Sequence, residues 1–378
     1  MQNYDLDNFE PAAKIVVIGV GGAGNNAVNR MIDKEISNVE FWVANTDKQA
    51  LSTSKAQHRI ILGQDITGGL GAGGEPEVGE KAAEASVDDI REIVKDANMV
   101  FIAAGMGGGT GTGAAPVVAR CAKEAGALVV AIVTRPFTFE GKRRVINSIN
   151  GLTRLKEQVD SIIVVSNDKL LVTAGNAPIS SAFLASDNVL AQSVETVINL
   201  ILLPAVINLD FADVKATLEN SGVGMIGFGV GQGQNRAKEA ANNALNSPLL
   251  EASITGARRA IVAVTCGRDV SLFDAQDCVN LLINASGHDI DLKFGVSIND
   301  QLSDEILVSV IASDFEEDVD FTKQDTYIPK REENIFASAP TGENKTEANK
   351  EAAIKQEEEQ VNVDDEDILP NFLKSSKE

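Results

Sequence analysis

The residues with the clearest chemical potential form the stretch Gly105–Gly113, which reads Gly-Met-Gly-Gly-Gly-Thr-Gly-Thr-Gly. An apolar run over 99–104 precedes it and predicts a buried parallel strand. A helical pattern follows from Ala114, with Pro116 expected in the first turn. Glycines at such a turn leave backbone N–H groups bare, and the helix N-terminus adds positive potential. We therefore predict a phosphate site, with a flexible linker as the disfavoured alternative. The candidate contacts are Gly107, Gly108, Gly109, Thr110 and Gly111.

A second glycine turn, Gly19–Gly24, follows a β-branched strand over 14–18 and precedes a helical segment over 25–31. The spacing Gly-x-Gly-x-x-Gly in this setting is typical of dinucleotide-binding folds. In those folds an acidic residue after the next strand takes a ribose hydroxyl, and Asp47 stands at that point. An NAD-dependent dehydrogenase is therefore an open alternative.

A third cluster, Gly68–Gly74, lies between the other two along the chain. A flexible loop and a ligand contact are equally good interpretations here, with Gly73 as the candidate contact. Glycine turns at several strand ends would meet at one edge of a parallel sheet, where open α/β sheets bind ligands. The chain contains no Gly-x-x-x-x-Gly-Lys-Ser/Thr, which excludes a P-loop enzyme. Several glycine turns therefore indicate a nucleotide with several phosphates, with Mg²⁺ supplying the cation.

Two charged residues, Glu140 and Arg144, follow a further strand over 128–134 and open a helix that runs to about residue 158. Both could reach the ribose and phosphates of such a nucleotide. Solvated residues at a helix start are the alternative.

Strands and helices alternate up to Ser166, which predicts a doubly wound parallel sheet. A long apolar helix over 186–203 is expected to lie between two layers, with Asp187 at its start. A loop over 208–213 and a short helix over 214–219 follow. From Gly222 onward the pattern predicts a smaller α+β domain with a mixed sheet. The expected division is a leader (1–12), a nucleotide-binding domain (13–185), the central helix and loop (186–221), the second domain (222–316), a disordered acidic linker (317–363) and a docking peptide (364–378).

The composition limits the partners. A formal net charge of −22 disfavours nucleic acid. Three widely spaced cysteines indicate a reducing compartment, and two histidines make a histidine-rich metal site improbable. The first residues predict no signal peptide, and no apolar run is long enough to insert into a membrane. These features predict a cytoplasmic protein.

Two motifs resemble those of a known family. The run over 107–113 resembles the tubulin signature, and Asn208-Leu209-Asp210-Phe211-Ala212-Asp213 resembles the loop that completes the active site in the tubulin/FtsZ family of GTPases. The similarity runs from about residue 14 to 314 and returns in the tail. It implies GTP or GDP as the bound nucleotide and GTP hydrolysis as the activity.

The resemblance also implies a role for individual residues. Asn167 and Asp187 would read the guanine, with Phe183 packed on the base. A carboxylate can accept from both the N1–H and the amino group of guanine, a donor pair that adenine lacks. The remaining implied nucleotide contacts are Gly21, Gly22, Ala23, Gly24, Asn25, Gly109, Thr110, Gly111, Glu140 and Arg144.

In this family the active site is completed by a neighbouring subunit, so the resemblance implies a head-to-tail homopolymer. Asn208, Asp210 and Asp213 would enter the next subunit's pocket and polarise the attacking water, although a capped turn is the alternative for the two acids. The tail Leu369–Lys374 resembles the family's docking peptide for FtsA-like membrane tethers, with Leu where Ile is usual. These features imply a place in the mid-cell division ring. A polymerising scaffold without hydrolysis is a further alternative.

Overall fold

The computed structural model describes residues 13–174, 179–202, 205–247, 254–267, 270–286, 290–299, 302, 304–316 and 321. These residues all belong to the first of two compact units, 1–329. The predicted leader, the docking peptide and nearly all of the predicted linker lie outside the described residues.

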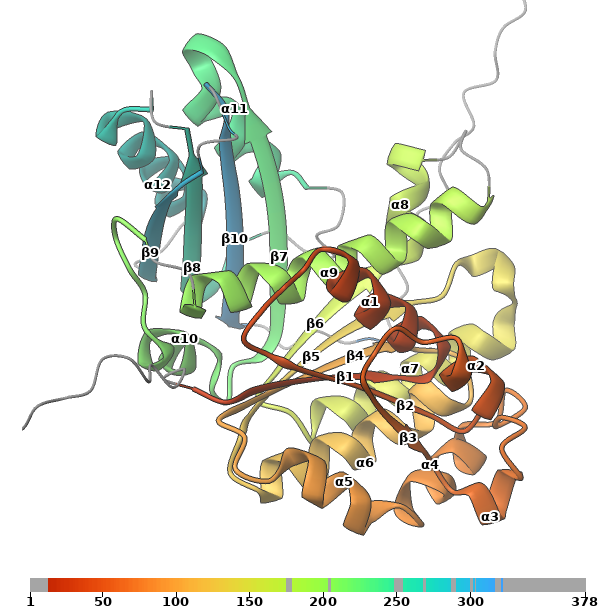
Figure 1. Ribbon diagram of the computed structural model, residues 1–378. Helices are drawn as coiled ribbons and strands as arrows, with labels where there is room; N and C mark the ends of the chain where they lie inside the picture. The colour runs from red at the N-terminus through yellow and green to blue at the C-terminus, as the bar shows by residue number, and fades with distance from the viewer. Residues whose placement is uncertain are drawn as a thin grey trace, which may run out of the picture. The chain divides into compact units, whose positions relative to one another are not determined.

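Six parallel strands form the first half of the sheet, in the order β3-β2-β1-β4-β5-β6 (Figure 1). This is the order of a doubly wound nucleotide-binding sheet, as the sequence predicted. The chain reverses its winding direction between β1 and β4, which pair along their whole length. The strands are β1 (Ile15–Val20), β2 (Glu40–Asn45), β3 (His58–Ile61), β4 (Met99–Gly105), β5 (Leu128–Arg135) and β6 (Ser161–Ser166).

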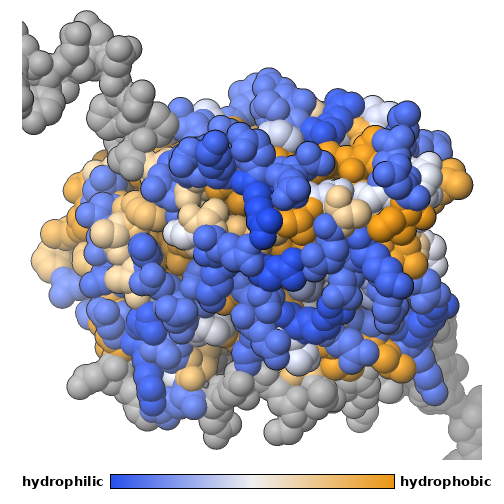
Figure 2. Space-filling model, turned by 90° about the horizontal axis from the view of Figure 1, so that it is seen from below, coloured by the Kyte–Doolittle hydropathy of each residue, from blue (hydrophilic) through white to orange (hydrophobic). Residues whose placement is uncertain are grey.

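Helices cover both faces of this half, because its strands are apolar on both sides. Val16 and Ile18 belong to one core cluster, and Ile15 and Val17 belong to the other. The first face carries α4 (Pro76–Glu84), α5 (Val87–Val94), α6 (Thr110–Glu124) and α7 (Lys142–Lys156). The second face carries α1 (Gly21–Asp33), α9 (Ile179–Leu202) and α10 (Phe211–Leu218). Seen from below, the surface is mostly hydrophilic with small apolar patches, as expected for the outer faces of amphipathic helices (Figure 2).

Four further strands continue the sheet in the order β7-β10-β8-β9. β10 is antiparallel to β7 and β8, whereas β9 is parallel to β8, so the predicted mixed sheet is confirmed. A short parallel pairing of β7 with β6 joins the two halves. The elements are β7 (Gly222–Gly231), β8 (Ala257–Cys266), β9 (Asp291–Ile298), β10 (Ile306–Phe315), α11 (Arg236–Leu245) and α12 (Leu272–Ser286).

The long helix α9 lies between the two halves of the sheet, as predicted (Figure 1). Its residues Leu190 and Val194 share one buried cluster with Val17 of the first half and with Ile226 and Ile311 of the second. A helix apolar around much of its circumference is stable only with a partner on more than one side, which this position supplies.

Four helices begin earlier than the sequence predicted. α1 begins at Gly21, four residues before the predicted segment over 25–31. α6 begins at Thr110, so Pro116 lies inside the helix and not in its first turn, and one backbone hydrogen bond is lost there. α9 begins at Ile179, which places Asp187 in the helix interior. α10 begins at Phe211, directly after its N-cap Asp210.

The α6 start was missed because its glycines resemble a loop. A Cβ on Gly113 would lie 1.9 Å from the carbonyl oxygen of Pro76 in α4, so glycine is needed there for helix packing.

Five further short elements were not predicted, because runs of three to eight residues carry little periodicity. They are α2 (Lys48–Ser52), β3, α3 (Gln64–Thr67), α8 (Asn167–Ala174) and the 3₁₀ turn η2 (Gly233–Asn235). Within the described residues, no helix is long and apolar enough to cross a membrane.

Asp160 supports the junction between the two halves. Its buried carboxylate accepts a hydrogen bond from the Val129 backbone N–H at 2.9 Å and lies 3.6 Å from the Lys123 ammonium. Its own backbone bonds to Val129 and to Gly222, at the start of β7. The carboxylate therefore fixes to β5 the residue that precedes β6 and whose backbone bonds to the start of β7.

We expect Asp160→Ala to lower the free energy of unfolding by about 1–3 kcal/mol, because the buried Val129 N–H loses its acceptor. Asp160→Asn keeps an acceptor oxygen and should cost clearly less. Urea unfolding followed by the fluorescence of Trp42, the single tryptophan, measures both variants. Equal losses in the two variants would contradict the role given to this hydrogen bond.

Candidate nucleotide site at the carboxyl edge of the parallel sheet

Two helix N-termini meet at the carboxyl ends of β1 and β4. A Cβ on Gly21, whose φ is +74°, would lie 2.8 Å from the backbone nitrogen of Gly111, so the two glycine turns are in contact. Neither N-cap residue, Val20 of α1 or Gly109 of α6, makes a side-chain capping hydrogen bond. The N–H groups of two first turns are therefore directed at one place, which suits an anion.

The glycines of these turns fall into two kinds. A Cβ on Gly24 would lie 2.2 Å from the carbonyl oxygen of Ala103, and one on Gly111 would lie 2.6 Å from that of Gly105. These glycines allow the backbones to pack closely. Three other predicted contacts, Gly22, Gly73 and Gly108, face open space, with no atom within 4 Å of an added Cβ. Glycines of this second kind leave the backbone open, so a ligand can lie directly against it.

Asn25 supports the first turn from beneath. Its side chain is buried, and with its amide nitrogen directed at the turn it donates to the carbonyl oxygens of Gly19 (3.0 Å) and Gly21 (2.8 Å). Its amide oxygen then accepts from the side chain of Asn45 at 3.2 Å. The predicted nucleotide contact of Asn25 could therefore come from its backbone N–H, because its side chain holds the turn in shape.

The third glycine loop is attached to the end of β2. The Gly71 N–H donates to the Thr46 carbonyl at 3.1 Å, and the Lys48 N–H donates to the Gly69 carbonyl at 2.9 Å. The Thr46 hydroxyl is also 2.7 Å from that of Thr110, at the start of α6. All three predicted glycine loops therefore lie at one edge of the sheet. Thr46, which the sequence analysis did not select, links two of them.

A cluster of aromatic rings lies beside this edge. Phe183 of α9 packs edge-on against Phe137, with ring centroids 5.2 Å apart, and Phe139 stacks on Phe137 with ring centroids 4.9 Å apart. Phe183 is 40% exposed, so part of its ring is available to a base. Glu140 accepts from the Phe137 N–H at 2.9 Å and pairs with Arg144, which fixes the turn before α7.

The two predicted guanine readers are both tied to α9. The buried Asn167 accepts a hydrogen bond from the Ser186 hydroxyl at 2.7 Å. Asp187 faces α1, where Asn26 bonds to its carboxylate and Arg30 lies nearby. Burial raises the pKa of the Asp187 carboxyl to about 6, against the lowering effects of Arg30 and Asn26. Asn26 and Arg30 were missed from the sequence, although their spacing of four puts them on one face of α1.

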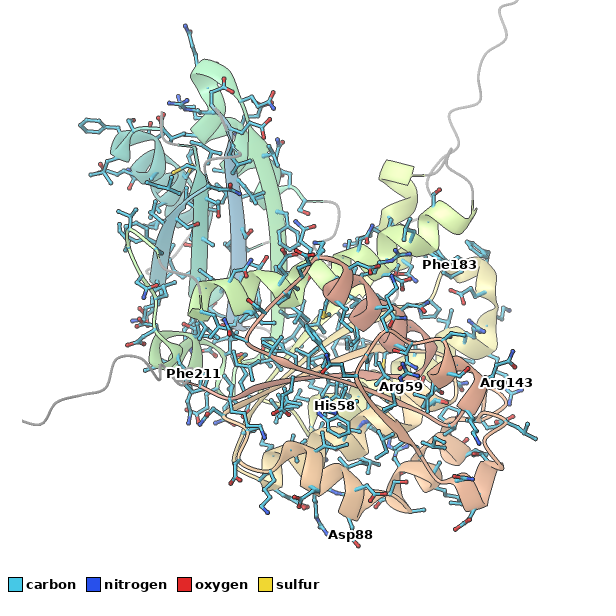
Figure 3. The ribbon with its side chains drawn as sticks, in the orientation of Figure 1. His58, Arg59, Asp88, Arg143, Phe183 and Phe211 are labelled. Carbon is cyan, nitrogen blue, oxygen red and sulfur yellow. The ribbon has the colours of Figure 1, made fainter. Side chains whose placement is uncertain are left out.

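The predicted catalytic residues lie in and just before α10, whose first residue, Phe211, is at the opposite end of α9 from Phe183 (Figure 3). Asp210 and Asp213 form a capping box: the Asp213 N–H donates to Asp210 at 2.9 Å, and the Asp210 N–H donates to Asp213 at 3.3 Å. Asn208 is exposed. Fifteen helical steps from Asp187 to Leu202 span about 22 Å. These three residues therefore cannot reach a nucleotide held by the glycine turns of the same chain.

The comparisons with known proteins agree with this geometry. Residues 14–175 match the Tubulin/FtsZ family GTPase domain, and residues 222–316 match the FtsZ family C-terminal domain. A solved structure of an empty FtsZ dimer from M. jannaschii is 42% identical, covers 84% of this chain and 95% of its own, and superimposes with a TM-score of 0.76. This chain belongs to the tubulin/FtsZ family.

Two further structures extend the comparison. A mutant FtsZ from M. jannaschii is also 42% identical and covers 82% of this chain and 94% of its own, with a TM-score of 0.78. CetZ2 from Haloferax volcanii, solved as a GTPγS-bound protofilament, is 22% identical and covers 81% and 94%, with a TM-score of 0.70. The likeness to CetZ2 shows the fold alone.

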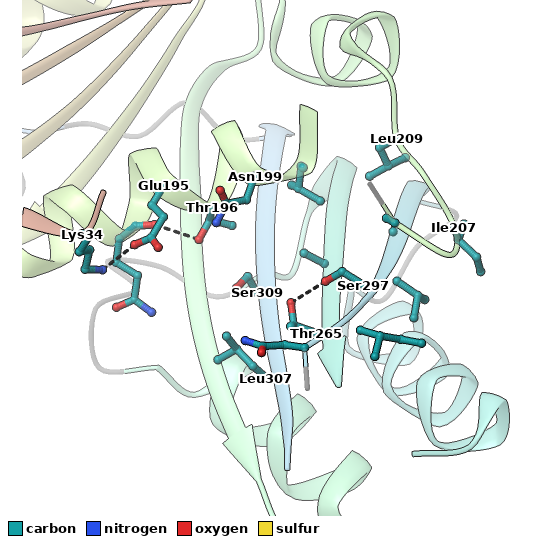
Figure 4. A pocket seen from close by; sticks show the side chains of 18 residues that line it. Lys34, Glu195, Thr196, Asn199, Ile207, Leu209, Thr265, Ser297, Leu307 and Ser309 are labelled. Atoms are coloured by element: carbon teal, nitrogen blue, oxygen red, sulfur yellow. Dashed lines mark hydrogen bonds and ion pairs between the residues drawn. The ribbon is translucent and has the colours of Figure 1, made fainter. Parts of the chain in front are cut away.

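A cavity of about 950 Å³ lies between α9 and the second half of the FtsZ sheet (Figure 4). Its walls include Asn199 and Leu200 of α9, Thr265 of β8 and Leu307 of β10. None of the predicted nucleotide contacts lines it, so it is separate from the glycine turns. Within the described part of this FtsZ-family chain, no three His, Cys, Asp or Glu side chains gather as a metal site, and the three cysteines are unpaired and buried.

The two kinds of glycine in this FtsZ-family site can be separated by substitution. We expect Gly22→Ala and Gly108→Ala to leave the free energy of unfolding within about 1 kcal/mol of the wild type. An added methyl group meets no atom at either position, and Gly22 lies in the first turn of α1, where alanine is favourable. Both should weaken GTP binding tenfold or more, because the methyl group occupies the path of a phosphate.

Gly24→Ala is the matched control, since its methyl would overlap Ala103 and cost about 3 kcal/mol or more. Titration with a fluorescent GTP analogue and urea unfolding measure the two effects. If affinity and stability fell in parallel in all three variants, the distinction between the two kinds of glycine would be wrong.

The raised pKa of Asp187 predicts that its ionised carboxylate lowers the stability of the folded protein at neutral pH. The folded protein binds the proton of the Asp187 carboxyl more tightly than the unfolded chain does. The stabilisation that this proton gives the folded state is therefore complete below pH 4 and is lost as pH rises through 6. Nucleotide-free Asp187→Asn should therefore be more stable than the wild type at pH 7.5, on the order of 1–3 kcal/mol.

The stability gain of Asp187→Asn should shrink to about half at pH 5, in thermal unfolding followed by Trp42 fluorescence. Glu195→Gln is the control on the same helix. Glu195 pairs with Lys34 at 2.5 Å, so its loss should bring no gain in stability. A variant at position 187 that is less stable than the wild type at pH 7.5 would refute this account of the partly buried carboxylate.

Proposed function

We propose that this chain hydrolyses GTP and assembles head to tail into filaments of the cell-division ring. Its glycine turns hold the phosphates, and the loop with Asn208, Asp210 and Asp213 completes the site of the next subunit. The observation that carries this proposal is the separation of the acids from the glycine turns along α9. A site divided in this way needs two subunits. Because the two contacting faces differ, the contact does not close and a filament results.

The guanine end of the site explains the nucleotide preference. Asp187, ionised on binding, accepts from guanine N1–H and the amino group, Asn167 bonds to the base edge, and Phe183 packs on its face. The remaining proposed nucleotide contacts are Gly21, Gly22, Ala23, Gly24, Asn25, Gly73, Gly107, Gly108, Gly109, Thr110, Gly111, Glu140 and Arg144. GDP would remain in the same place after hydrolysis.

The chemical step needs little from the protein beyond position and charge. The carboxylates of Asp210 and Asp213 orient and polarise the water that attacks the γ-phosphate, and the backbone N–H groups of the glycine turns bind the phosphate oxygens. Mg²⁺, when bound, neutralises charge on the β- and γ-phosphates. The hydroxyls of Thr46 and Thr110 beside the turns suit a magnesium ion that keeps most of its ligands from water and phosphate.

The family supports the cellular part of the proposal. Relatives are described as an FtsZ dimer and, for CetZ2, as a GTPγS-bound protofilament. We propose that this chain forms such filaments at mid-cell in the cytoplasm. The tail Leu369–Lys374, outside the described residues, would dock on an FtsA-like membrane tether, so that no part of this chain enters the bilayer itself.

The dehydrogenase interpretation is disfavoured by the role of Asp47. Its Oδ1 accepts from the backbone N–H groups of Gln49 (2.8 Å) and Ala50 (3.1 Å) and caps α2, so this carboxylate has a structural role that explains its presence without a ribose. The match to a GTPase domain over 14–175 points the same way.

Turnover tests the divided site. Because only a subunit with a neighbour can hydrolyse GTP, the rate per subunit should rise with protein concentration and then reach a plateau. Asp213→Asn keeps an oxygen for the capping box but removes the charge, so we expect turnover to fall at least tenfold while GTP affinity stays within twofold.

Glu219→Gln, an acid-to-amide change just beyond the other end of α10, is the control and should retain full turnover. A rate per subunit independent of concentration would count against the divided site. Unchanged turnover in Asp213→Asn would remove the catalytic role given to Asp213. Filaments of the wild type that form without any GTP turnover would favour a scaffold that does not hydrolyse GTP.

A further inference from the structure

The loop over 205–210, which precedes α10, lies along the free edge of the sheet. β9 is the last strand and pairs with β8 on one side only. On its other side, Val296 accepts backbone hydrogen bonds from Val206 (2.8 Å) and Ile207 (3.2 Å), and its own N–H donates to Ile207 at 3.0 Å. The loop is therefore docked on β9 as a very short antiparallel strand.

This docking decides which side chains of the loop face outward. Ile207 is bonded to β9 and Leu209 is buried at 5% exposure, whereas Asn208 and Asp210 between and beyond them are exposed. The alternation has the period of two expected for an extended segment. A slip of one residue along β9 would turn Asn208 and Asp210 inward and Leu209 outward.

Side-chain burial and backbone bonds both hold the loop in place. Leu209 belongs to the buried cluster around α9, and Ile207 packs against the cluster of the second half of the sheet. Both also form part of the wall of the cavity between α9 and the second half of the sheet (Figure 4). The backbone bonds to β9 set the register in which these two side chains are held.

The strand has a glycine where it meets the loop. A Cβ on Gly295 would lie 3.3 Å from the Ile207 carbonyl oxygen and 3.4 Å from a methyl carbon of Leu209. A branched side chain would overlap both. We propose that Gly295 and Val296 of β9 are positioning residues for hydrolysis: they hold the loop in the register that presents Asn208 and Asp210 to the next subunit. This inference rests on the proposed function, because it assumes that the loop acts in trans.

The test uses two variants that are each inactive but complement one another. Asp187→Ala cannot bind GTP and can only donate its loop, whereas Asp213→Asn binds GTP but has a defective loop. Their mixture should hydrolyse GTP at contacts where the first variant supplies the loop. Gly295→Val is then added to one partner at a time, since valine is favourable in a strand but overlaps the loop.

We expect Gly295→Val to lower the activity of the mixture at least fivefold when the loop donor carries it. In the GTP-binding partner, whose loop is already defective, the same change should alter activity by less than twofold. GTP affinity of Gly295→Val alone should stay within twofold of the wild type. Lys293→Val, two residues earlier on the same face of β9, is the matched control and should have no effect in either partner.

Each other outcome is decisive. Equal loss of activity in both mixtures would show a general folding defect and would overturn the positioning role. No loss of activity in either mixture would also overturn the positioning role. If the parent mixture without Gly295→Val were inactive while the wild type hydrolyses GTP, the divided site itself would be wrong, and this inference would fall with it.

Discussion

The whole site depends on backbone N–H groups at two helix N-termini that the sheet brings together. β1 and β4 are neighbours, so α1 and α6 begin side by side, and their glycine turns touch. No cationic side chain is needed to create positive potential there, because aligned peptide dipoles and uncapped N–H groups supply it. This explains how a chain with a net charge of −22 can offer a polyphosphate site without a P-loop lysine.

The length of α9 is the second constraint. It holds Phe183 and Asp187 near the glycine turns and leads to the acid loop at its far end, with both halves of the sheet packed around it. A stiff helix of this kind keeps nucleotide and acids apart within one chain, and we propose that it thereby links hydrolysis to assembly. Its packing also has a cost at Asp187, whose partly buried carboxylate carries a pKa raised to about 6. A partly buried acid with a raised pKa is more typical of a binding site than of a structural core.

The second half of the sheet is more than an addition to the nucleotide-binding half. It joins β6 through β7, supplies apolar residues to the cluster around α9, and ends in β9, on which the acid loop is docked. The loop that carries Asn208 and Asp210 thus follows α9 and is bonded to β9 at Val206 and Ile207. The cavity between α9 and the second half of the sheet borders this loop at Ile207 and Leu209, and the backbone bonds to Val296 set the register of the loop there.

The sequence alone determined the doubly wound sheet, the mixed second sheet, the glycine turns and the family, because strand periodicity, glycine spacing and motif order are local properties. It did not determine where helices begin when glycines open them, as in α6, or when apolar residues extend them, as in α9. Only the tertiary structure decided that Gly24 packs against Ala103 while Gly22 stays open, that Asn25 supports its turn from beneath, and that Asp187 lies inside a helix against α1. It also placed the acids far from the glycine turns. These properties depend on contacts between segments distant in the chain, and no local pattern encodes the distance that a packed helix sets between its two ends.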